Sequence, residues 1–215
     1  MISKRIKTIA DMIDIAESVV DVGCDHGYLA VCLKNKGHQG KILCVDNKEG
    51  PLNKAKENID KYQLDNTDTL LSNGLENVKD IMDVVVIAGI GCKTMIQIIS
   101  SNIEYFESNR LILQSNDNVD LLREWLNKSG FKIDDETILK DYKYYEILQV
   151  SKGKQNLTAL ELEFGPFLLK EKSPVFVECY KQKRDKLIRI LENLPSKHPD
   201  RFELEQNIKK IETII

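Results

Sequence analysis

Acidic residues and glycines near the start of the chain are spaced as in a ligand-binding turn. They form the pattern Asp21-x-Gly23-x-Asp25-x-Gly27, which directly follows a short apolar run. Glycines at such a turn let the backbone approach a ligand closely, and the helix that follows offers free N–H groups. About twenty positions later stands Asp46, where a carboxylate accepts hydrogen bonds from ribose hydroxyls. Together these residues predict a pocket for a nucleoside.

The carboxylate of Asp25 narrows the choice of ligand. In the dinucleotide-binding turn G-x-G-x-x-G, the middle glycine leaves room for a pyrophosphate, which an acidic side chain would repel. A ligand amine, in contrast, would be attracted. The form D-x-G-x-(G/D)-x-G resembles the cofactor loop of S-adenosylmethionine-dependent methyltransferases, whose ligand carries an ammonium and a sulfonium group. A dinucleotide site and a purely structural turn are the alternatives, and Asp46 favours the methyltransferase interpretation.

The elements that must position these residues alternate between strand and helix from Val19 to about Leu126. Met82–Gly91 is a continuous β-branched run, which is typical of a strand buried on both faces. The alternation predicts a doubly wound, mostly parallel α/β sheet, with ligands beyond the carboxyl ends of its strands. Two later strands, Phe131–Asp134 and Tyr144–Val150, are predicted at an antiparallel end of the sheet. The segments expected to meet at the ligand edge are 21–27, Asp46, Asn73-Gly74, Ala88–Gly91 and Gln114–Asn116.

The pattern changes at about Phe164. Ser173-Pro174 is expected to start a long amphipathic helix, Pro195–Pro199 to interrupt it, and Arg201 to begin a second helix. These two helices predict an antiparallel, coiled-coil-like hairpin. We therefore expect two domains, a Rossmann-like catalytic domain over 1–163 and a hairpin appendage over 164–215.

Charge is distributed unevenly along the chain. The net charge is −3 overall, with 18 Lys and Arg against 24 Asp and Glu before Ser151 and 13 against 10 from there on. A cationic tail on an acidic body indicates a polyanionic partner, such as RNA. The alternative is an ordinary solvated helix face. The candidate RNA-binding residues are Arg5 near the N-terminus and Lys181, Lys183, Arg184, Lys186 and Arg189 on the predicted long helix.

The five cysteines form no C-x-x-C pair and have no histidine at ligand spacing. We therefore expect a reduced protein without a metal site. The first residues lack the apolar segment of a signal peptide, and no apolar run approaches membrane-spanning length. These features predict a soluble, cytoplasmic protein without a membrane partner, and no obligate protein partner is evident.

Over essentially its whole length, the chain resembles the bacterial tRNA adenine-N1 methyltransferases that modify adenine 22, the TrmK type. The resemblance rests on Ser3-Lys-Arg-Ile, Asp21-Val-Gly-Cys-Asp-His-Gly-Tyr-Leu, Val86-Ile-Ala-Gly-Ile-Gly, Leu113-Gln-Ser-Asn, Trp125-Leu, Gly130-Phe, Tyr145-Glu and Glu163-Phe-Gly-Pro-Phe-Leu-Leu. The chain departs from the family where Cys24 and Gly27 replace serine and alanine, where Asp46 replaces a frequent glutamate, and where Asn73 replaces a frequent aspartate. An asparagine can still hydrogen-bond an adenine edge.

This resemblance implies a class I methyltransferase fold, S-adenosyl-L-methionine as cofactor and tRNA as substrate. It implies that Asp21 and Asp25 lie toward the methionine end, Asp46 on ribose and Asn73 on adenine. The full implied cofactor set is Asp21, Gly23, Cys24, Asp25, Gly27, Asp46, Asn73, Gly74, Ala88 and Gly89. The implied catalytic residues, which would frame the target base, are His26, Tyr28 and Gly89.

Adenine N1 carries its own lone pair, so the chemistry requires orientation toward the methyl group rather than a strong base. The base must also be unpaired or flipped out of its stack. Two other functions stay open: a methyltransferase for a small molecule or protein, and a non-catalytic RNA-binding module of the same fold.

Overall fold

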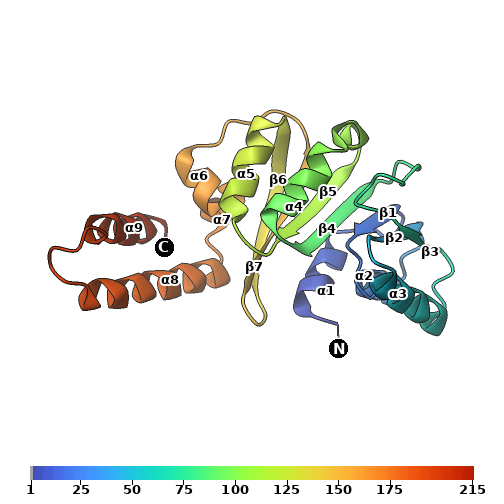
Figure 1. Cartoon of the computed structure of the whole chain (residues 1–215), viewed down its shortest axis with the longest axis horizontal. Helices are drawn as coiled ribbons and strands as arrows, with labels where there is room; N and C mark the ends of the chain where they lie inside the picture. Colours follow the sequence, from blue (N-terminus) through green and yellow to red (C-terminus); the bar gives the residue numbers. More distant parts are fainter. Residues whose placement is uncertain (1) are drawn as a thin grey trace.

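The computed structural model describes residues 2–215 and contains a seven-stranded sheet with helices on both faces (Figure 1). The strand order is β3-β2-β1-β4-β5-β7-β6. Strands β1 to β5 are parallel, whereas β7 is antiparallel to both β5 and β6. This topology confirms the predicted doubly wound, mostly parallel sheet. The strands are β1 (Val19–Val22), β2 (Ile42–Asp46), β3 (Thr67–Leu71), β4 (Val84–Ile90), β5 (Arg110–Ser115), β6 (Phe131–Lys140) and β7 (Tyr144–Lys152).

Helices cover both faces of this sheet and form a separate pair at the C-terminus. The helices are α1 (Lys4–Asp11), α2 (Tyr28–Asn35), α3 (Glu49–Tyr62), α4 (Cys92–Ser100), a 3₁₀ turn η1 (Ile103–Phe106), α5 (Val119–Lys128), α6 (Ala159–Phe164), α7 (Pro166–Glu171), α8 (Pro174–Asn193) and α9 (Arg201–Ile214). The sheet separates two cores, one shared with α1, α2 and α3 and the other with α4 and α5. Within β4, Val84 and Val86 enter the first core, whereas Val85 and Ile87 enter the second. This alternation explains the continuous apolar run, because both faces of the strand are covered.

The direction of chain winding reverses at β1. Strand β2 lies on one side of β1 and β4 on the other, with Val22 paired to both Val45 and Ile87. The loops that follow these strands therefore begin at the same level of the sheet. Such a switch point opens a crevice at the carboxyl ends of the strands.

The predicted end of the first antiparallel strand at Asp134 is wrong, because β6 continues to Lys140. A register shift between Ile133 and Asp135 breaks the alternation of inward and outward side chains. Beyond it, the inward position holds Glu136, which is 1% exposed and bonded to the buried Arg123. A charged residue at a core position therefore concealed the strand in the sequence.

Helices α6 and α7 were not predicted, since each has six residues and so shows little periodicity. Thr158 and Glu161 form a capping box at the start of α6. Helix α6 lies against α5, and α7 lies against β6. Both short helices therefore pack on the catalytic body.

Helices α8 and α9 lie side by side at one end of the molecule, joined by a short loop (Figure 1). Phe176, Tyr180 and Ile211 share a third core with Phe164 and Leu168 of the short helices. The hairpin is thus connected to the body by apolar packing. The division into domains at residue 163 stays a prediction.

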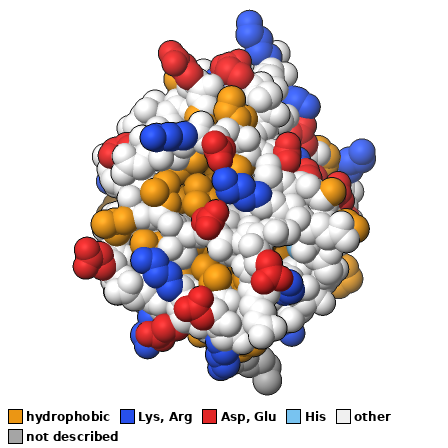
Figure 2. All heavy atoms as spheres, turned by 90° about the vertical axis from the view of Figure 1, so that its right-hand side faces the viewer, with side chains coloured by type: hydrophobic (Ala, Val, Ile, Leu, Met, Phe, Trp, Pro, Cys, Tyr) orange, Lys and Arg blue, Asp and Glu red, His pale blue; other side chains and the backbone are white. Residues whose placement is uncertain are grey.

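The opposite end of the molecule, at the β3 edge, carries Lys, Arg, Asp and Glu side chains interspersed around hydrophobic side chains (Figure 2). A face of mixed sign does not concentrate a polyanion. Among the helices of residues 2–215, none combines the length and hydropathy that a membrane-spanning segment requires.

Candidate active site

The turn after β1 places its two glycines in the left-handed backbone region. Gly23 has φ +77° and Gly27 has φ +68°. The N–H groups of Gly23 and Cys24 both donate to the carbonyl oxygen of Val45, at 2.8 and 3.0 Å. A Cβ at Gly27 would lie 3.3 Å from that of Ala55 in α3. The turn is therefore held by β2 on one side and by close helix packing on the other.

Asp21 lies beneath this turn and is 6% exposed. Burial, which disfavours the charged form, and the nearby carboxylate of Asp46 raise the pKa of Asp21 to about 7. The Arg5 guanidinium opposes this rise, and the Asp25 carboxylate adds to it. A cation beside a buried carboxylate stabilises its ionised form, so Asp21 is suited to bind an ammonium group.

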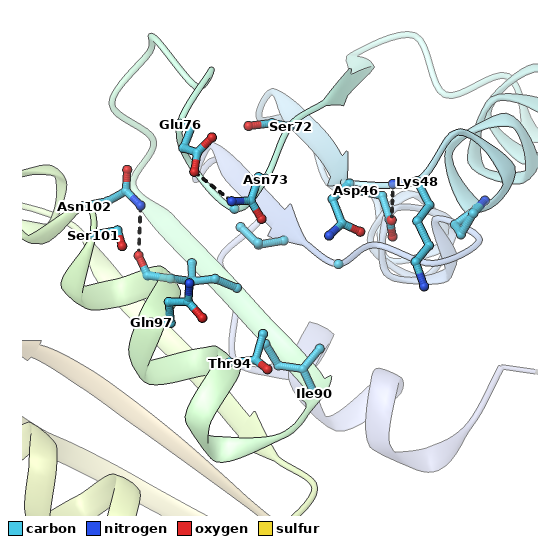
Figure 3. Close-up of a pocket in the computed structure, with 16 residues that line it drawn as sticks. Asp46, Lys48, Ser72, Asn73, Glu76, Ile90, Thr94, Gln97, Ser101 and Asn102 are labelled. Atoms are coloured by element: carbon cyan, nitrogen blue, oxygen red, sulfur yellow. Dashed lines mark hydrogen bonds between the residues drawn. The ribbon is translucent and has the colours of Figure 1, made fainter.

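A first cavity of about 310 Å³ opens beyond β1, β2 and β3 (Figure 3). Asp46 lies on one wall, where its Oδ1 accepts a hydrogen bond from the Lys48 N–H at 3.0 Å. Across the cavity, the Asn73 amide nitrogen donates to Glu76 Oε1 at 2.7 Å, as Figure 3 shows. This bond leaves the carbonyl oxygen of Asn73 as an acceptor, while Asp46 offers its second oxygen. The predicted residues Gly23, Asp46, Asn73 and Gly74 all line this cavity.

The far wall of the first cavity comes from α4 and the two residues after it, none of which was predicted as part of the site. The lining side chains of this wall are Thr94, Gln97, Ile98, Ser101 and Asn102. Their spacing follows one helix face, opposite the buried Met95 and Ile99. This polar face beside an apolar one was the signal that could have identified the wall.

A second cavity, of about 300 Å³, lies on the other side of the turn. Gly23 and Ile90 line both cavities, so the two spaces meet at these residues. Helix α1 contributes Arg5 to the wall of the second cavity, and α2 contributes Tyr28. The predicted residues that line it are Arg5, Asp21, Gly23, Cys24, Asp25, Tyr28, Ala88 and Gly89.

Gly89 forms the floor of the second cavity at an irregularity in β4. The pairing with β5 shifts between Ala88 and Ile90, and Gly89 has φ +80°. A Cβ at this position would lie 2.8 Å from Nη1 of Arg5, whose guanidinium donates to Gln114. The Gly89 carbonyl in turn accepts from the Asn116 amide at 2.6 Å. The left-handed backbone favours glycine here, and a Cβ would require the Arg5 guanidinium to shift.

His26 and Tyr28 differ in their access to the site. Tyr28 lines the second cavity and is 44% exposed, whereas His26 lines neither cavity. The His26 ring stacks on Tyr28 at 5.5 Å between centroids, and its Nε2 lies 3.3 Å from Asp25. His26 therefore contacts two residues that line the second cavity, Tyr28 and Asp25, without lining it itself.

Cys24 lies in the second cavity wall as a neutral thiol. Its side chain bonds to Cys44, and this bond, together with burial, raises the pKa of Cys24 far above the ordinary range of a thiol. All five cysteines are free and buried. Within residues 2–215, no group of three or more His, Cys, Asp or Glu side chains is arranged to hold a metal ion.

The five predicted cationic residues of α8 do not act as one surface. Lys183 and Lys186 line a third space, of about 610 Å³, between the hairpin and residues 115–120. We call this space the hairpin cleft. Arg184 bonds to Asp185 at 2.7 Å, and Lys181 and Arg189 are exposed outside the cleft.

The crevice thus has a buried acid, Asp21, at the glycine turn and a second acid, Asp46, at the end of the next strand. A match along the chain agrees with this arrangement. The sequence profile of the tRNA (adenine(22)-N(1))-methyltransferase family, TrmK, matches residues 19–213. The chain belongs to this family. Members of it are S-adenosylmethionine-dependent enzymes that methylate N1 of adenine 22 in tRNA.

Relatives match over nearly their full lengths. The tRNA (adenine(22)-N(1))-methyltransferase of Bacillus subtilis strain 168 is 30% identical over 221 residues, covering 98% of this chain and 92% of the relative. A Streptococcus pneumoniae protein, described as a candidate tRNA (m1A22) methyltransferase and solved with S-adenosyl-L-methionine, is 36% identical with a TM-score of 0.89 and coverage of 100% and 99%. The TrmK of M. capricolum, solved with S-adenosyl-homocysteine, is 29% identical with a TM-score of 0.84 and coverage of 99% and 97%. The family predicted from the sequence is thus confirmed.

Proposed function

We propose that the chain carries out its family's reaction, methylation of N1 of adenine 22 in tRNA, with the cofactor and the target base in the two joined cavities. The observation that carries this assignment is the meeting of the cavities at Gly23 and Ile90, directly beside Gly89. A ligand that extends from one cavity to the other passes this point. The transfer would therefore take place beside Gly89, which contributes no side chain of its own.

The residues of the first cavity fit the nucleoside part of S-adenosylmethionine. The free oxygen of Asp46 suits a ribose hydroxyl, and the free carbonyl of Asn73 suits the adenine amino group. The methionine part of the cofactor would extend to Asp21 and Asp25 at the second cavity, where two carboxylates suit its ammonium group. Such groups at close range form charge-assisted hydrogen bonds, which are stronger than neutral ones. When bound, S-adenosylmethionine supplies an electrophilic methyl group on its sulfonium.

The residues of the second cavity would hold the target adenine. The exposed ring of Tyr28 offers a stacking surface for a base that has left its helix. Gly89 adds no side chain of its own between N1 and the methyl group, and the Arg5 guanidinium lies against it. The reaction makes the base cationic, and the carboxylates of Asp21 and Asp25 lie where they stabilise that charge. The chain's contribution is therefore orientation and electrostatics.

We further infer that the protein acts on tRNA in the cytoplasm. Its five cysteines are free, which suits a reducing compartment.

A methylation assay tests this function. The protein is incubated with labelled S-adenosylmethionine and unmodified bacterial tRNA, and the tRNA is then digested for nucleoside analysis. We expect 1-methyladenosine that disappears when adenine 22 is replaced by guanine. Methylation that survives this replacement would refute the target position, and the absence of any methylation would refute the activity.

A further inference from the structure

The hairpin cleft is the largest of the three spaces, and the cofactor does not account for it. Its walls come from both parts of the molecule: residues 115–120 and Glu146 on the catalytic body, and one face of α8 with part of α9. The α8 residues in it follow helical spacing: Tyr180, Lys183, Lys186, Leu187 and Ile190. The cleft therefore needs the hairpin to be complete.

The acidic and the basic side chains of the cleft lie on different walls. On the catalytic side lie the carboxylates of Asp117, Asp120, Glu146 and Glu163. The buried Arg123 is bonded to Glu146 and Glu136, and Glu163 is paired with Lys210. On the hairpin side, Lys183 and Lys186 are exposed, and within residues 2–215 neither has a carboxylate within 4.0 Å. Lys183 lies over the Tyr180 ring, 4.3 Å from its centroid.

A polyanion cannot enter such a space with its phosphates first, because the acidic side would repel them. It can place phosphates on the lysines at the rim and direct a base inward. The amino groups of adenine, cytosine and guanine would find acceptors in Asp117 and Glu146. A cavity of about 610 Å³ has room for one base with its sugar.

The cleft is also next to the place of reaction. Asn116 lines the cleft, and its amide donates to the carbonyl of Gly89 in the second cavity. The Lys143 Nζ lies 3.5 Å from the Asn116 carbonyl oxygen and 5.2 Å from the centroid of the Tyr145 ring. The Arg5 guanidinium lies over the same ring, 5.4 Å from its centroid. Cationic side chains therefore continue from the catalytic cavity toward the cleft.

We propose that the hairpin cleft binds a second unstacked nucleotide of the tRNA, next to the target adenosine, with its base inward and its phosphate on Lys183 and Lys186. This proposal rests on the proposed function, since the neighbouring cavity must hold the target base. It assigns the two lysines a role that the other cations of α8 do not share. The bound base would be one that carries an amino group.

The first test uses the full-length protein and unmodified tRNA, with matched pairs of substitutions on α8. Lys183→Ala with Lys186→Ala should weaken tRNA binding at least about tenfold and reduce the slope of log Kd on log salt by roughly 1.5. Lys181→Ala with Arg189→Ala removes the same charge outside the cleft and should change Kd less than about threefold. Equal effects of the two pairs would overturn the proposal.

The second test fills the cleft without changing charge. Asn207→Trp, on the α9 wall, and Ile190→Trp, on the α8 wall, should each weaken tRNA binding, whereas the exposed neighbour Gln206→Trp should not. Cofactor Kd and the thermal unfolding midpoint serve as folding controls for all three variants. If both filled variants fold and bind tRNA like Gln206→Trp, the cleft holds no nucleotide.

Abasic tRNAs identify the bound base. At one position flanking adenine 22, an abasic tRNA should bind the wild type at least about fivefold more weakly than intact tRNA does. The same abasic tRNA should bind Asn207→Trp less than about twofold more weakly than intact tRNA does, because the filled cleft has already lost its contact with that base. Equal weakening of both proteins at every position would overturn the proposal. If the wild type does not methylate adenine 22, it is the proposed function that is refuted. If the wild type methylates adenine 22 and the cleft variants bind tRNA as tightly as it does, only the proposed nucleotide site in the cleft is refuted.

Discussion

Asp21 should make cofactor binding depend on pH between 5 and 7. Its carboxyl group is 6% exposed and has a pKa of about 7, raised by burial and by Asp46 against the opposing effect of Arg5. An ammonium group beside this carboxylate favours its ionised form. Cofactor and proton therefore compete for Asp21, and lowering the pH should weaken cofactor binding.

The expected magnitude follows from that pKa. The ionised fraction of Asp21 falls from about one half at pH 7 to about one tenth at pH 6 and about one hundredth at pH 5. If only the ionised form binds, the Kd of S-adenosylmethionine rises about fivefold and then about fiftyfold relative to pH 7. Isothermal titration calorimetry at constant ionic strength measures this Kd, and buffers of different ionisation enthalpy report the proton released.

Two variants decide whether Asp21 is responsible. Asp21→Asn should bind the cofactor weakly, with a Kd that no longer changes over this range. His26→Gln should retain the pH dependence; it is the necessary control, because histidines also change charge in this range and His26 contacts Asp25. A wild-type Kd that is constant from pH 5 to 7, or a pH dependence that disappears only in His26→Gln, would refute this reasoning.

The same pKa makes the cofactor-free protein less stable as the pH rises. The folded-state pKa lies above the ordinary 3.8, so the folded protein holds this proton more tightly than the unfolded chain does. The contribution to the free energy of unfolding is therefore fully present below pH 4 and is lost as the pH rises through 7, by at most roughly 4 kcal/mol. Urea unfolding of the wild type and of Asp21→Asn should diverge over this interval, and parallel curves would contradict it.

Three further substitutions test the rest of the site. Asp46→Ala removes the acceptor for ribose and should raise the cofactor Kd at least about tenfold in calorimetry; an unchanged Kd would exclude the ribose assignment. Gly89→Ala places a Cβ 2.8 Å from Arg5 Nη1 and should lower kcat for tRNA methylation about tenfold or more, because small displacements of reacting groups are costly; a wild-type kcat would show that the floor tolerates a side chain. Arg123→Met leaves Glu136 and Glu146 without their partner and should cost about 3–5 kcal/mol in urea unfolding; a cost below about 1 kcal/mol would mean that the carboxylates become protonated or hydrated instead.

Local patterns were sufficient to predict most of the fold. The long helix predicted from Ser173-Pro174 begins at Pro174 with Ser173 as its N-cap, and the second helix begins at Arg201 as predicted. The strand β6 was cut short because its inward position holds Glu136, and the partner that makes this burial possible, Arg123, lies on another element. Such long-range pairing cannot be recognised from neighbouring residues.

The candidate site was predictable where one strand end carries its own chemical signal, as with Asp21 and Asp46. It was not predictable where a helix contributes ordinary residues, as α4 does through Thr94 and Gln97. Arg5 shows a third case. The sequence offers it as one of several candidate tRNA-binding cations, and in the structure its guanidinium lies against Gly89 in the second cavity. Only the packing of α1 against the sheet reveals that position.

The uneven charge of the chain follows from its two substrates, whose charges differ in sign. A cofactor with an ammonium and a sulfonium group is attracted by Asp21 and Asp25, but the same carboxylates repel the phosphates of tRNA. An acidic crevice therefore needs cations from outside it to retain the RNA. In this fold Arg5 of the first helix lies in the second cavity, whereas Lys143 of the β6–β7 turn and the lysines of α8 lie outside both cavities of the crevice. If so, raising the salt concentration should weaken tRNA binding far more than cofactor binding to the buried Asp21, because exposed charges are screened more strongly.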